Sequence, residues 1–280
     1  MYSAAAVKKK IGARPGAAGD RLPRDAADEP RLTARLVLLG ASNVRRGLPV
    51  VVQTASAAFG PHLEVFGAIG HGRSYGKRSC IPFRCLPGIL DCGIWEALSA
   101  GAPAAETAIV TDVGNDIQYG ADAASILGWV RECAARLTAR GAAIRITGLP
   151  LARLERIRPS EYIFFRTLFF RGSRVGRDHA LREAAAIDAG LRDLAARTGA
   201  TMVETSVDWY GADPIHILRP KRADAWARIL GVSAISGPMG LRDAVRLRTA
   251  APALRWIAGV EQRRKQPSLA FRDGTRVSLY

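Results

Sequence analysis

Two kinds of hydrophobic pattern alternate along the chain. Short, nearly continuous apolar runs are typical of strands covered on both faces, and apolar residues that recur every three or four positions are typical of helices packed on a core. The first short run, Leu36 to Leu39, ends at Gly40 and Ala41, which allow a sharp turn. The predicted strands lie at 36–39, 63–69, 107–113, 143–147 and 201–205. The predicted helices lie at 44–59, 87–98, 121–140, 180–197 and 221–230.

This alternation predicts an α/β fold, in which a parallel sheet carries helices on both faces. Right-handed crossovers bring the carboxyl ends of all the strands to one edge of such a sheet, and ligands bind at that edge. Ser42, Gly72, Asn115 and His216 follow the first, second, third and fifth predicted strands. We therefore expect these four residues to lie close together.

The residue types at this edge suggest nucleophilic catalysis. Ser42 stands where a strand passes into a helix, beside the N–H groups of the first helical turn. His216 is a candidate base for its hydroxyl, and Asp213, three residues earlier, is a candidate partner that orients the imidazole. An attacked ester develops an oxyanion, which needs donors fixed in advance. The candidate donors are the N–H groups of Ser42 and Gly72 and the side-chain amide of Asn115.

Each of these positions also has a purely structural interpretation. Ser42 or Asn43 is a favoured N-cap for the helix that follows, and Asp213 precedes a proline in a typical turn. Asp112 ends a predicted strand, where we expect a buried hydrogen-bonding carboxylate, and Asp116 is expected to order its loop. The sequence of motifs, taken together, favours catalysis.

The four motifs, in this order, resemble the blocks of the SGNH, or GDSL-type, serine hydrolase superfamily over residues 35–231. The first block, Gly-Asp-Ser, corresponds to Gly40-Ala41-Ser42. The second-block glycine corresponds to Gly72, since Gly72-Arg73-Ser74 is similar to the Gly-Arg-Ser of some carbohydrate esterases of the superfamily. The third block, Gly-x-Asn-Asp, corresponds to Val113-Gly114-Asn115-Asp116, and the last, Asp-x-x-His, to Asp213-Pro214-Ile215-His216.

The resemblance implies a flavodoxin-like three-layer sandwich with a five-stranded parallel sheet, Ser/His/Asp catalysis, and no metal or cofactor. The implied catalytic residues are Ser42, Asp213 and His216, and the implied oxyanion donors belong to Ser42, Gly72 and Asn115. Two positions depart from the family pattern. Ala41 replaces the first-block aspartate, which is not the nucleophile, and Val113 replaces the third-block glycine but leaves the Asn115 donor in place.

A second serine satisfies a different motif. Gly72-Arg-Ser74-Tyr-Gly76 matches G-x-S-x-G, the nucleophile elbow of α/β-hydrolases. That elbow needs a helix directly after its serine, whereas the residues after Ser74 include Lys77, Arg78 and two prolines without an apolar helical stripe. A phosphate-binding turn at the same glycines is disfavoured for the same reason. We therefore expect Ser74 to be a loop residue, in an irregular segment at 77–86.

Two further segments lie outside the repeated pattern. Residues 151–176 carry five aromatic residues within nine positions, interleaved with arginines. They form either a lid or acyl pocket, with contact to a membrane surface as one option, or a helix packed on the core with arginines at its rim; the second interpretation is favoured. Residues 232–280 are a C-terminal extension with helical stretches at 241–247 and 253–264 and a terminal hairpin around Asp273-Gly274.

The composition adds a strong positive charge, +16 over 280 residues. Residues 1–33, which have no hydrophobic period and are predicted to form a disordered tail, hold part of the excess, as do 151–182 and 241–280. Such a charge favours anionic partners. No recognition-helix, RRM or finger pattern accompanies it, so no specific nucleic-acid binding is expected, and arginine-rich composition of the source is a sufficient explanation.

The four cysteines (Cys80, Cys85, Cys92 and Cys133) have no zinc-ligand spacing. No apolar segment follows Lys8-Lys9-Lys10, and no run approaches the roughly 20 apolar residues of a membrane span. We therefore expect reduced thiols in a cytoplasmic protein, with one local disulfide as the alternative.

The sequence thus predicts a serine esterase that acts on a small-molecule, glycan or lipid ester. An acyltransferase that uses the same site, and a catalytically silent basic binding module, are the alternatives. The acyl chain length, the acyl carrier and the oligomeric state are not encoded in these motifs.

Overall fold

The computed structural model describes residues 34–280 except 102, 104 and 234–238. These residues belong to one compact unit that starts at Leu32. The disordered tail predicted for residues 1–33 lies outside the described residues.

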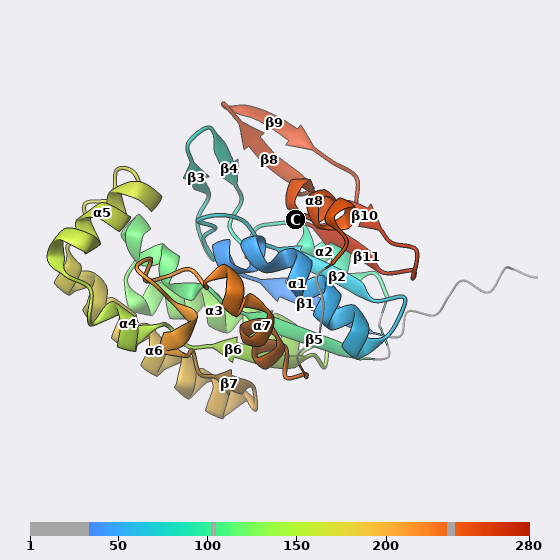
Figure 1. Cartoon of the computed structure of the whole chain (residues 1–280), viewed down its shortest axis with the longest axis horizontal. Coiled ribbons are helices and arrows are strands. Elements are labelled where there is room, and N and C mark those ends of the chain that lie inside the picture. Colours follow the sequence, from blue (N-terminus) through green and yellow to red (C-terminus); the bar gives the residue numbers. More distant parts are fainter. Residues whose placement is uncertain (1–33, 102, 104, 234–238) are drawn as a thin grey trace, which may run out of the picture. The chain divides into compact units, whose positions relative to one another are not determined.

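The centre of this unit is a parallel sheet whose strands are the five that the sequence predicts. In spatial order they run β2-β1-β5-β6-β7, and every neighbouring pair is parallel (Figure 1). Their bounds are β1 Arg35–Leu39, β2 Glu64–Ala68, β5 Glu106–Val110, β6 Ala143–Thr147 and β7 Thr201–Val203. Each strand is a short apolar run because helices cover both faces of the sheet. The predicted α/β fold class is confirmed.

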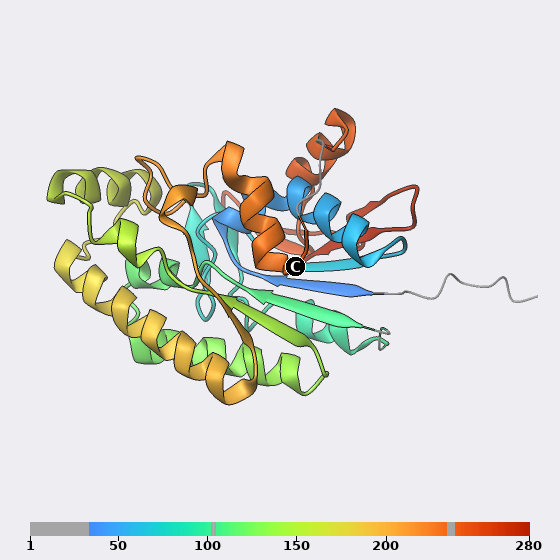
Figure 2. The same ribbon diagram turned by 60° about the horizontal axis from the view of Figure 1, so that its bottom comes forward.

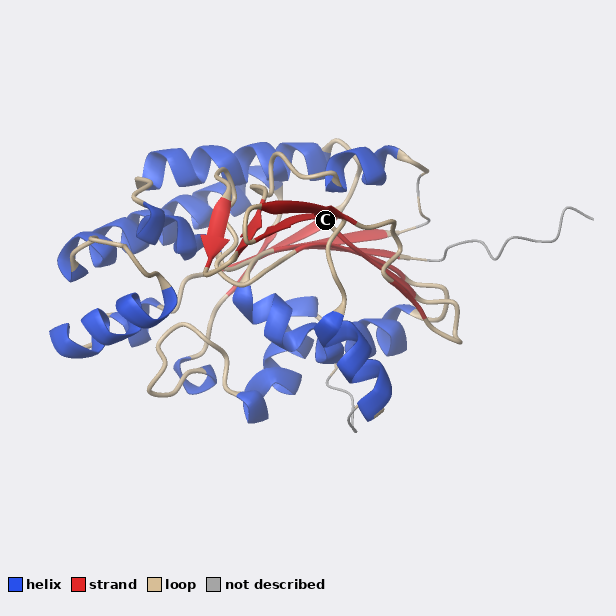
Figure 3. Ribbon diagram, turned by 90° about the horizontal axis from the view of Figure 1, so that it is seen from above, coloured by secondary structure: helices blue, strands red, loops and turns tan. Residues whose placement is uncertain are grey.

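Helices form a layer on each face of this sheet (Figures 2 and 3). Alternate residues of β1 divide between two cores: Leu36 and Leu38 pack in one, and Val37 and Leu39 in the other. The first core lies against α1, α7 and α8, with bounds Ser42–Phe59, Arg222–Leu230 and Leu241–Thr249. The second lies against α2, α3 and α6, with bounds Ile94–Ser99, Ala123–Thr138 and Arg177–Thr198. The result is a three-layer sandwich.

The sheet is wider than the five strands expected, because the C-terminal segment adds two more. β11 (Arg276–Leu279) pairs in parallel with β2, and β10 (Leu269–Ala270) pairs antiparallel with β11. The turn between them has Gly274 at φ +83°, and the N–H of Thr275 donates to Asp273 Oδ1 at 2.9 Å. The extension is therefore part of the central sheet.

A second, antiparallel sheet corrects two predictions. It has the order β3-β4-β8-β9, with bounds Ser79–Ile81, Arg84–Leu86, Leu254–Ile257 and Val260–Arg263. The segment 77–86 is therefore a hairpin and not irregular, and 253–264 is a hairpin and not a helix. Strands of three or four residues carry little periodicity of their own, and the pairing of β4 with β8 joins segments far apart in the chain.

The cysteine prediction is also wrong in part. Cys80 and Cys85 face each other across the β3–β4 pair and form a disulfide, whereas Cys92 and Cys133 are free and buried. The register of the hairpin, which the sequence analysis did not anticipate, is what brings the two sulfurs together. The cytoplasmic location stays a prediction, and disulfides are typical of oxidising compartments.

Candidate active site

Ser42 is the first residue of α1, at the carboxyl end of β1. The turn before it is tight: a Cβ on Gly40 would come within 2.7 Å of Thr111 Cγ2, so only glycine fits there. The buried Tyr75 hydroxyl fixes the ends of the two adjacent strands, at 3.1 Å from Leu39 O and 2.8 Å from Thr111 O. Ala41, and not Ser42, is the N-cap residue of α1, and the Ser42 hydroxyl pairs with His216 instead, so the N-cap interpretation does not apply to Ser42.

The structure brings Ser42, His216 and Asp213 into a chain of contacts. Ser42 Oγ lies 2.9 Å from His216 Nε2, and His216 Nδ1 lies 2.6 Å from Asp213 Oδ2. Ser42 and His216 are almost fully buried, with 7% and 6% of their surfaces exposed. The other carboxylate oxygen, Asp213 Oδ1, accepts the N–H groups of Ile215 and His216 at 3.1 and 3.2 Å. The loop after β7 therefore holds the carboxylate and the imidazole as a unit.

The electrostatic state of Asp213 suits a partner for an imidazolium. Burial alone would raise the pKa of this carboxyl, but the hydrogen bond from His216 and the charge of His216, together with two backbone N–H groups, hold it below its ordinary value. Arg46 adds a distant positive charge, with Nη1 3.9 Å from Asp213 Oδ2. The lowered pKa keeps the Asp213 carboxylate ionised beside the imidazole.

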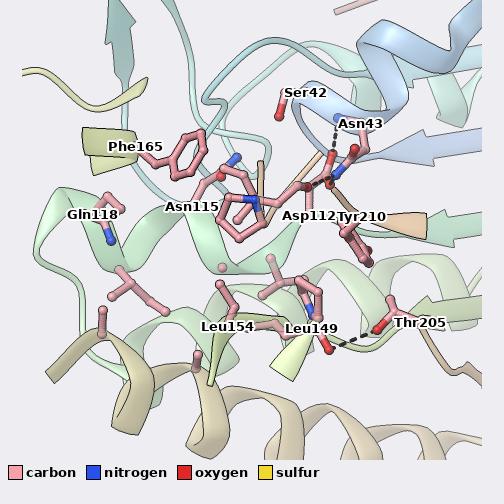
Figure 4. A pocket seen from close by; sticks show the side chains of 18 of the residues that line it. Ser42, Asn43, Asp112, Asn115, Gln118, Leu149, Leu154, Phe165, Thr205 and Tyr210 are labelled. Carbon is pink, nitrogen blue, oxygen red and sulfur yellow. Dashed lines mark hydrogen bonds between the residues drawn. The ribbon is translucent and has the colours of Figure 1, made fainter. Parts of the chain in front are cut away.

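Asn115 lies in the 3₁₀ segment Val113–Tyr119 and lines the same cavity as Ser42 (Figure 4). Its Nδ2 is buried and has no hydrogen-bond partner among the described residues. Burying an amide N–H without a partner costs roughly 1–3 kcal/mol, so this group is poised to donate to a ligand. Gly72 lies in the turn after β2 at φ +59°, where a Cβ would come within 2.7 Å of Ile81 Cδ1.

Asn43 and Asp112 form a network that the sequence analysis did not assign to the site (Figure 4). Asp112 Oδ2 accepts the N–H groups of Ala41 and Asn43 at 2.9 and 3.0 Å, and its Oδ1 accepts Asn43 Nδ2 at 2.7 Å. Asn43 Nδ2 also donates to Ile215 O at 2.8 Å, and Asn43 Oδ1 accepts Ile217 N at 2.8 Å. Asn43 thus holds the residues on both sides of His216 and ties them to the serine turn.

The backbone conformation of Asp112 marks this network. Asp112 is a non-glycine residue in the left-handed region, at φ +59°. Such a conformation costs about 1–3 kcal/mol and persists where surrounding contacts fix it. The three hydrogen bonds that its carboxylate accepts are those contacts. The expectation of a buried hydrogen-bonding carboxylate therefore fits Asp112, although its link to the serine turn was not foreseen.

Ser74, the alternative nucleophile, is fully buried and structural. Its Oγ donates to Asp116 Oδ1 and accepts the N–H groups of Lys77 and Gly76 at 2.8 and 3.2 Å. Burial raises the pKa of Asp116 to about 6, against the opposing hydrogen bonds from Ser74 and Tyr75. No histidine is among the hydrogen-bond partners of Ser74 within the described part of the chain. The loop interpretation of Ser74 therefore holds.

The segment after β6 forms one wall of the cavity beside Ser42. It contains α4 (Leu151–Leu154) and α5 (Pro159–Phe169), and α5 has no buried residue. Tyr162 of α5 is partly buried and packs against the core, while Phe165 and Phe169 line the cavity, so α5 combines features of the core-helix and the acyl-pocket interpretations. The aromatic residues that line the cavity are Tyr162, Phe165, Phe169, Phe170, Trp209 and Tyr210. The Phe169 ring meets the His216 ring edge-on, with centroids 4.8 Å apart. We call this space the aromatic cavity.

The outer face of α5 is also apolar, with Ile163, Phe164 and Leu168 more than half exposed. No helix among the described residues is long and apolar enough to cross a membrane. Contact with a membrane surface stays a prediction. In the same part of the chain, no three His, Cys, Asp or Glu side chains are grouped in a way that would hold a metal ion.

Comparison with known proteins identifies the fold. Neither protein-family models nor curated protein sequences match this chain. One solved crystal structure, 13% identical, aligns with a TM-score of 0.52 over 71% of this chain and 96% of its own. The psychrotrophic esterase EstA from Pseudoalteromonas sp. aligns at 0.43, with 12% identity, over 69% of this chain and 93% of that one. A GDSL-like lipase from Bacteroides thetaiotaomicron aligns at 0.43, with 11% identity, over 70% and 84%.

These likenesses concern the fold. The chain has a mostly parallel sheet flanked by helices, and the structure that aligns with a TM-score of 0.52 supports this fold. The fold expected from the four sequence blocks is confirmed. The residues that act in this chain follow from its own geometry.

Proposed function

We propose that the protein is a serine esterase that hydrolyses a carboxylic ester through an acyl-serine intermediate. The observation that carries this proposal is the chain of contacts from Ser42 Oγ to His216 Nε2, at 2.9 Å, and from His216 Nδ1 to Asp213 Oδ2, at 2.6 Å. A nucleophile within reach of a base, and a third group that orients that base, together activate a serine hydroxyl.

The first half of the reaction forms the acyl-serine. Ser42 Oγ attacks the ester carbonyl carbon while His216 Nε2 takes the hydroxyl proton, and the carbonyl oxygen becomes an oxyanion. The unpartnered Nδ2 of Asn115 donates to that oxyanion, with the N–H groups of Ser42 and Gly72 as the other donors. When the intermediate collapses, the bond to the leaving oxygen breaks and His216 gives its proton to the alcohol.

The second half releases the acid. His216 takes a proton from water, the hydroxide oxygen attacks the acyl carbon, and collapse returns the proton to Ser42 Oγ. Asp213 stays ionised throughout and stabilises the imidazolium at each half-reaction. Transfer of the acyl group to another alcohol shares every step up to the acyl-serine, so analysis of the products distinguishes hydrolysis from transfer.

The aromatic cavity takes the acyl chain. Its lining is mostly apolar, from the loop after β5 through α4, α5 and α6, and it opens beside Ser42. Burial of apolar surface stabilises a bound chain by about 25 cal/mol per Å². This lining favours an aliphatic acyl group over acetyl. The alcohol part then lies on the other side of Ser42.

Labelling with a fluorophosphonate probe, followed by peptide mass spectrometry, tests the proposal. We expect an adduct on Ser42 in the wild type and none in His216→Ala. An adduct on Ser74 would assign the nucleophile to the other motif. If the protein is folded but carries no adduct, the result would contradict the esterase and favour the binding-module alternative.

A further inference from the structure

Four arginines in the neighbourhood of Ser42 lie outside the lining of the aromatic cavity. Arg45 and Arg46 belong to the first turns of α1, immediately after Ser42. Arg84 and Arg255 belong to β4 and β8, neighbouring strands of the second sheet. We call Arg45, Arg46, Arg84 and Arg255 the arginine cluster. None of the four lines the aromatic cavity.

The packing of the second sheet brings β4 to the loop that follows β2. A Cβ on Gly70 would come within 2.2 Å of Leu86 Cδ1, and a Cβ on Gly72 within 2.7 Å of Ile81 Cδ1. The β3–β4 hairpin therefore lies directly on the Gly70–Gly72 turn, beside the start of α1 (Figures 1 and 2). Arg84 is in this hairpin, and its charge acts on both His71 in the turn and Arg45 in the first turn of α1.

The pKa of His71, in the middle of that turn, depends on the charges around it. Burial first, and then the positive charge of Arg84, lower the pKa of His71 to about 4. Arg46, Arg45 and His216 act in the same direction. The three arginine charges that act on His71 thus all lower its pKa.

Three of the four arginines of the cluster, Arg45, Arg84 and Arg255, have no acidic partner among the described residues. Arg84 has neither a side-chain hydrogen bond nor an ion pair with any described residue, and burial and the charge of Arg255 lower its pKa. Arg255 Nε donates to the neutral Gln262 Oε1 at 2.9 Å, and Arg45 donates to the carbonyls of Arg248 and Ala250, both at 2.8 Å. Arg46 reaches one carboxylate, that of Asp213, at 3.9 Å. Like charges held together in this way repel one another, and a bound anion would offset that cost.

We infer that the arginine cluster binds a phosphate or carboxylate on the alcohol or thiol part of the ester. This inference rests on the proposed function and specifies its substrate class. An amphiphilic ester fits both sides of Ser42: its acyl chain enters the aromatic cavity while its anionic group meets the guanidinium groups. Arginine is suited to this task because its planar fork of donors matches carboxylate and phosphate oxygens. The anion would belong to the leaving group and depart with it.

The test compares two esters that differ only in charge, 1-octanoylglycerol and 1-octanoylglycerol 3-phosphate, both as monomers in solution. The measured quantity is the ratio of kcat/KM for the phosphorylated ester to kcat/KM for the neutral one, from released octanoate. We expect a ratio of about ten or more in the wild type, since hydrogen bonds to charged groups have effects of this size. Arg84→Gln should lower the ratio about tenfold.

Arg272→Gln is the matched control. Arg272 is exposed, in the turn between β10 and β11, and that turn lies at the amino end of β2, away from Ser42. The substitution removes the same charge and should leave the ratio unchanged. Equal ratios in the wild type and in Arg84→Gln, or an equal loss in Arg272→Gln, would overturn the inference. A preference seen only when the esters are presented in vesicles would assign the charge to surface attraction and would also overturn it.

Failure of the proposed function gives a different result. If the wild type cleaves neither ester, esterase activity is contradicted, and equilibrium binding of glycerol 3-phosphate then tests the cluster by itself. Saturable binding in the wild type that is lost in Arg84→Gln and kept in Arg272→Gln would support the anion site. Absence of saturable binding in the wild type would overturn it.

Discussion

Asn43 Nδ2 donates a 2.7 Å hydrogen bond to Asp112 Oδ1, and this contact joins the nucleophile turn to the loop after β5. The same amide group holds Ile215 O and Ile217 N, the backbone atoms on either side of His216. Asn43 and Asp112 are therefore positioning residues: they touch neither Ser42 Oγ nor the His216 ring but fix the backbone that carries both.

Removal of this amide should impair the reaction more than substrate binding. We expect Asn43→Ala to lower kcat about 10- to 100-fold with little change in KM, because a displacement of about 1 Å between reacting groups has an effect of this size. Steady-state kinetics and the rate of fluorophosphonate labelling measure it. Asn43→Asp keeps the size but sets a carboxylate against Asp112, so its loss should be at least as large. A wild-type kcat in Asn43→Ala, in folded protein, would show that the network has no positioning role.

The Asn115 side chain should increase activity and decrease the stability of the folded protein. Its Nδ2 is buried without a partner, so Asn115→Leu should raise the free energy of unfolding by about 1 kcal/mol, because it removes an unsatisfied polar group. The same change should lower kcat roughly 100- to 1000-fold, since one oxyanion donor is lost. Urea denaturation and ester hydrolysis measure the two effects. Lower stability with unchanged kcat would mean that the amide serves the fold and not the oxyanion.

The aromatic cavity should set the preference for acyl chain length. Phe169 packs on the His216 ring and lines the cavity, and we expect Phe169→Ala to reduce kcat/KM for octanoyl esters more than for acetyl esters. Phe164→Ala is the control on the same helix, because Phe164 is 60% exposed and does not line the cavity. A chain-length profile with p-nitrophenyl esters measures both. Equal profiles for the two variants would place the acyl chain elsewhere.

Because of Asp116, the free energy of unfolding should fall as the pH rises, whereas paired carboxylates make it rise. Its pKa is about 6 in the folded protein against an ordinary value of 3.8, so the folded state favours the protonated form. Its contribution to stability is therefore full below pH 4 and is lost as the pH rises through 6. The difference amounts to about 3 kcal/mol. Denaturant unfolding of the wild type and Asp116→Asn at several pH values isolates this contribution. A constant difference between the two proteins from pH 4 to 7 would refute it.

The five parallel strands of the central sheet were predictable because each is a short, largely apolar run and helical segments separate them. Ser42, Asn115 and His216 come together for the same reason, since parallel topology gathers strand ends whatever the details of the loops. The second sheet was not predictable. Its strands have three or four residues, and they are held by pairs such as Cys85 with Trp256 that no local pattern encodes.

Two other features depended on geometry that a sequence pattern does not carry. The Asn43–Asp112 network requires Asp112 at φ +59°, and an aspartate at a strand end gives no sign of that conformation. The aromatic residues of 159–169 are equally compatible with a core helix and a cavity wall, because the periodicity is the same whichever surface the helix meets. In the structure Phe165 and Phe169 line the cavity, and Tyr162 also packs against the core.

The pairing of β11 with β2 has a consequence for the order of folding. Residues 64–67 pair with 276–279, so one edge of β2 has no neighbour until a segment on the order of 200 residues later in the chain arrives. Until then the exposed backbone N–H and C=O groups of β2 offer a template to any other extended chain. In the folded protein β11 covers that edge of β2. The outermost strand on this side, β10, has only two residues, so it offers a neighbouring chain little backbone to pair with. Self-association through the β2 edge is therefore a hazard of the nascent chain more than of the folded protein.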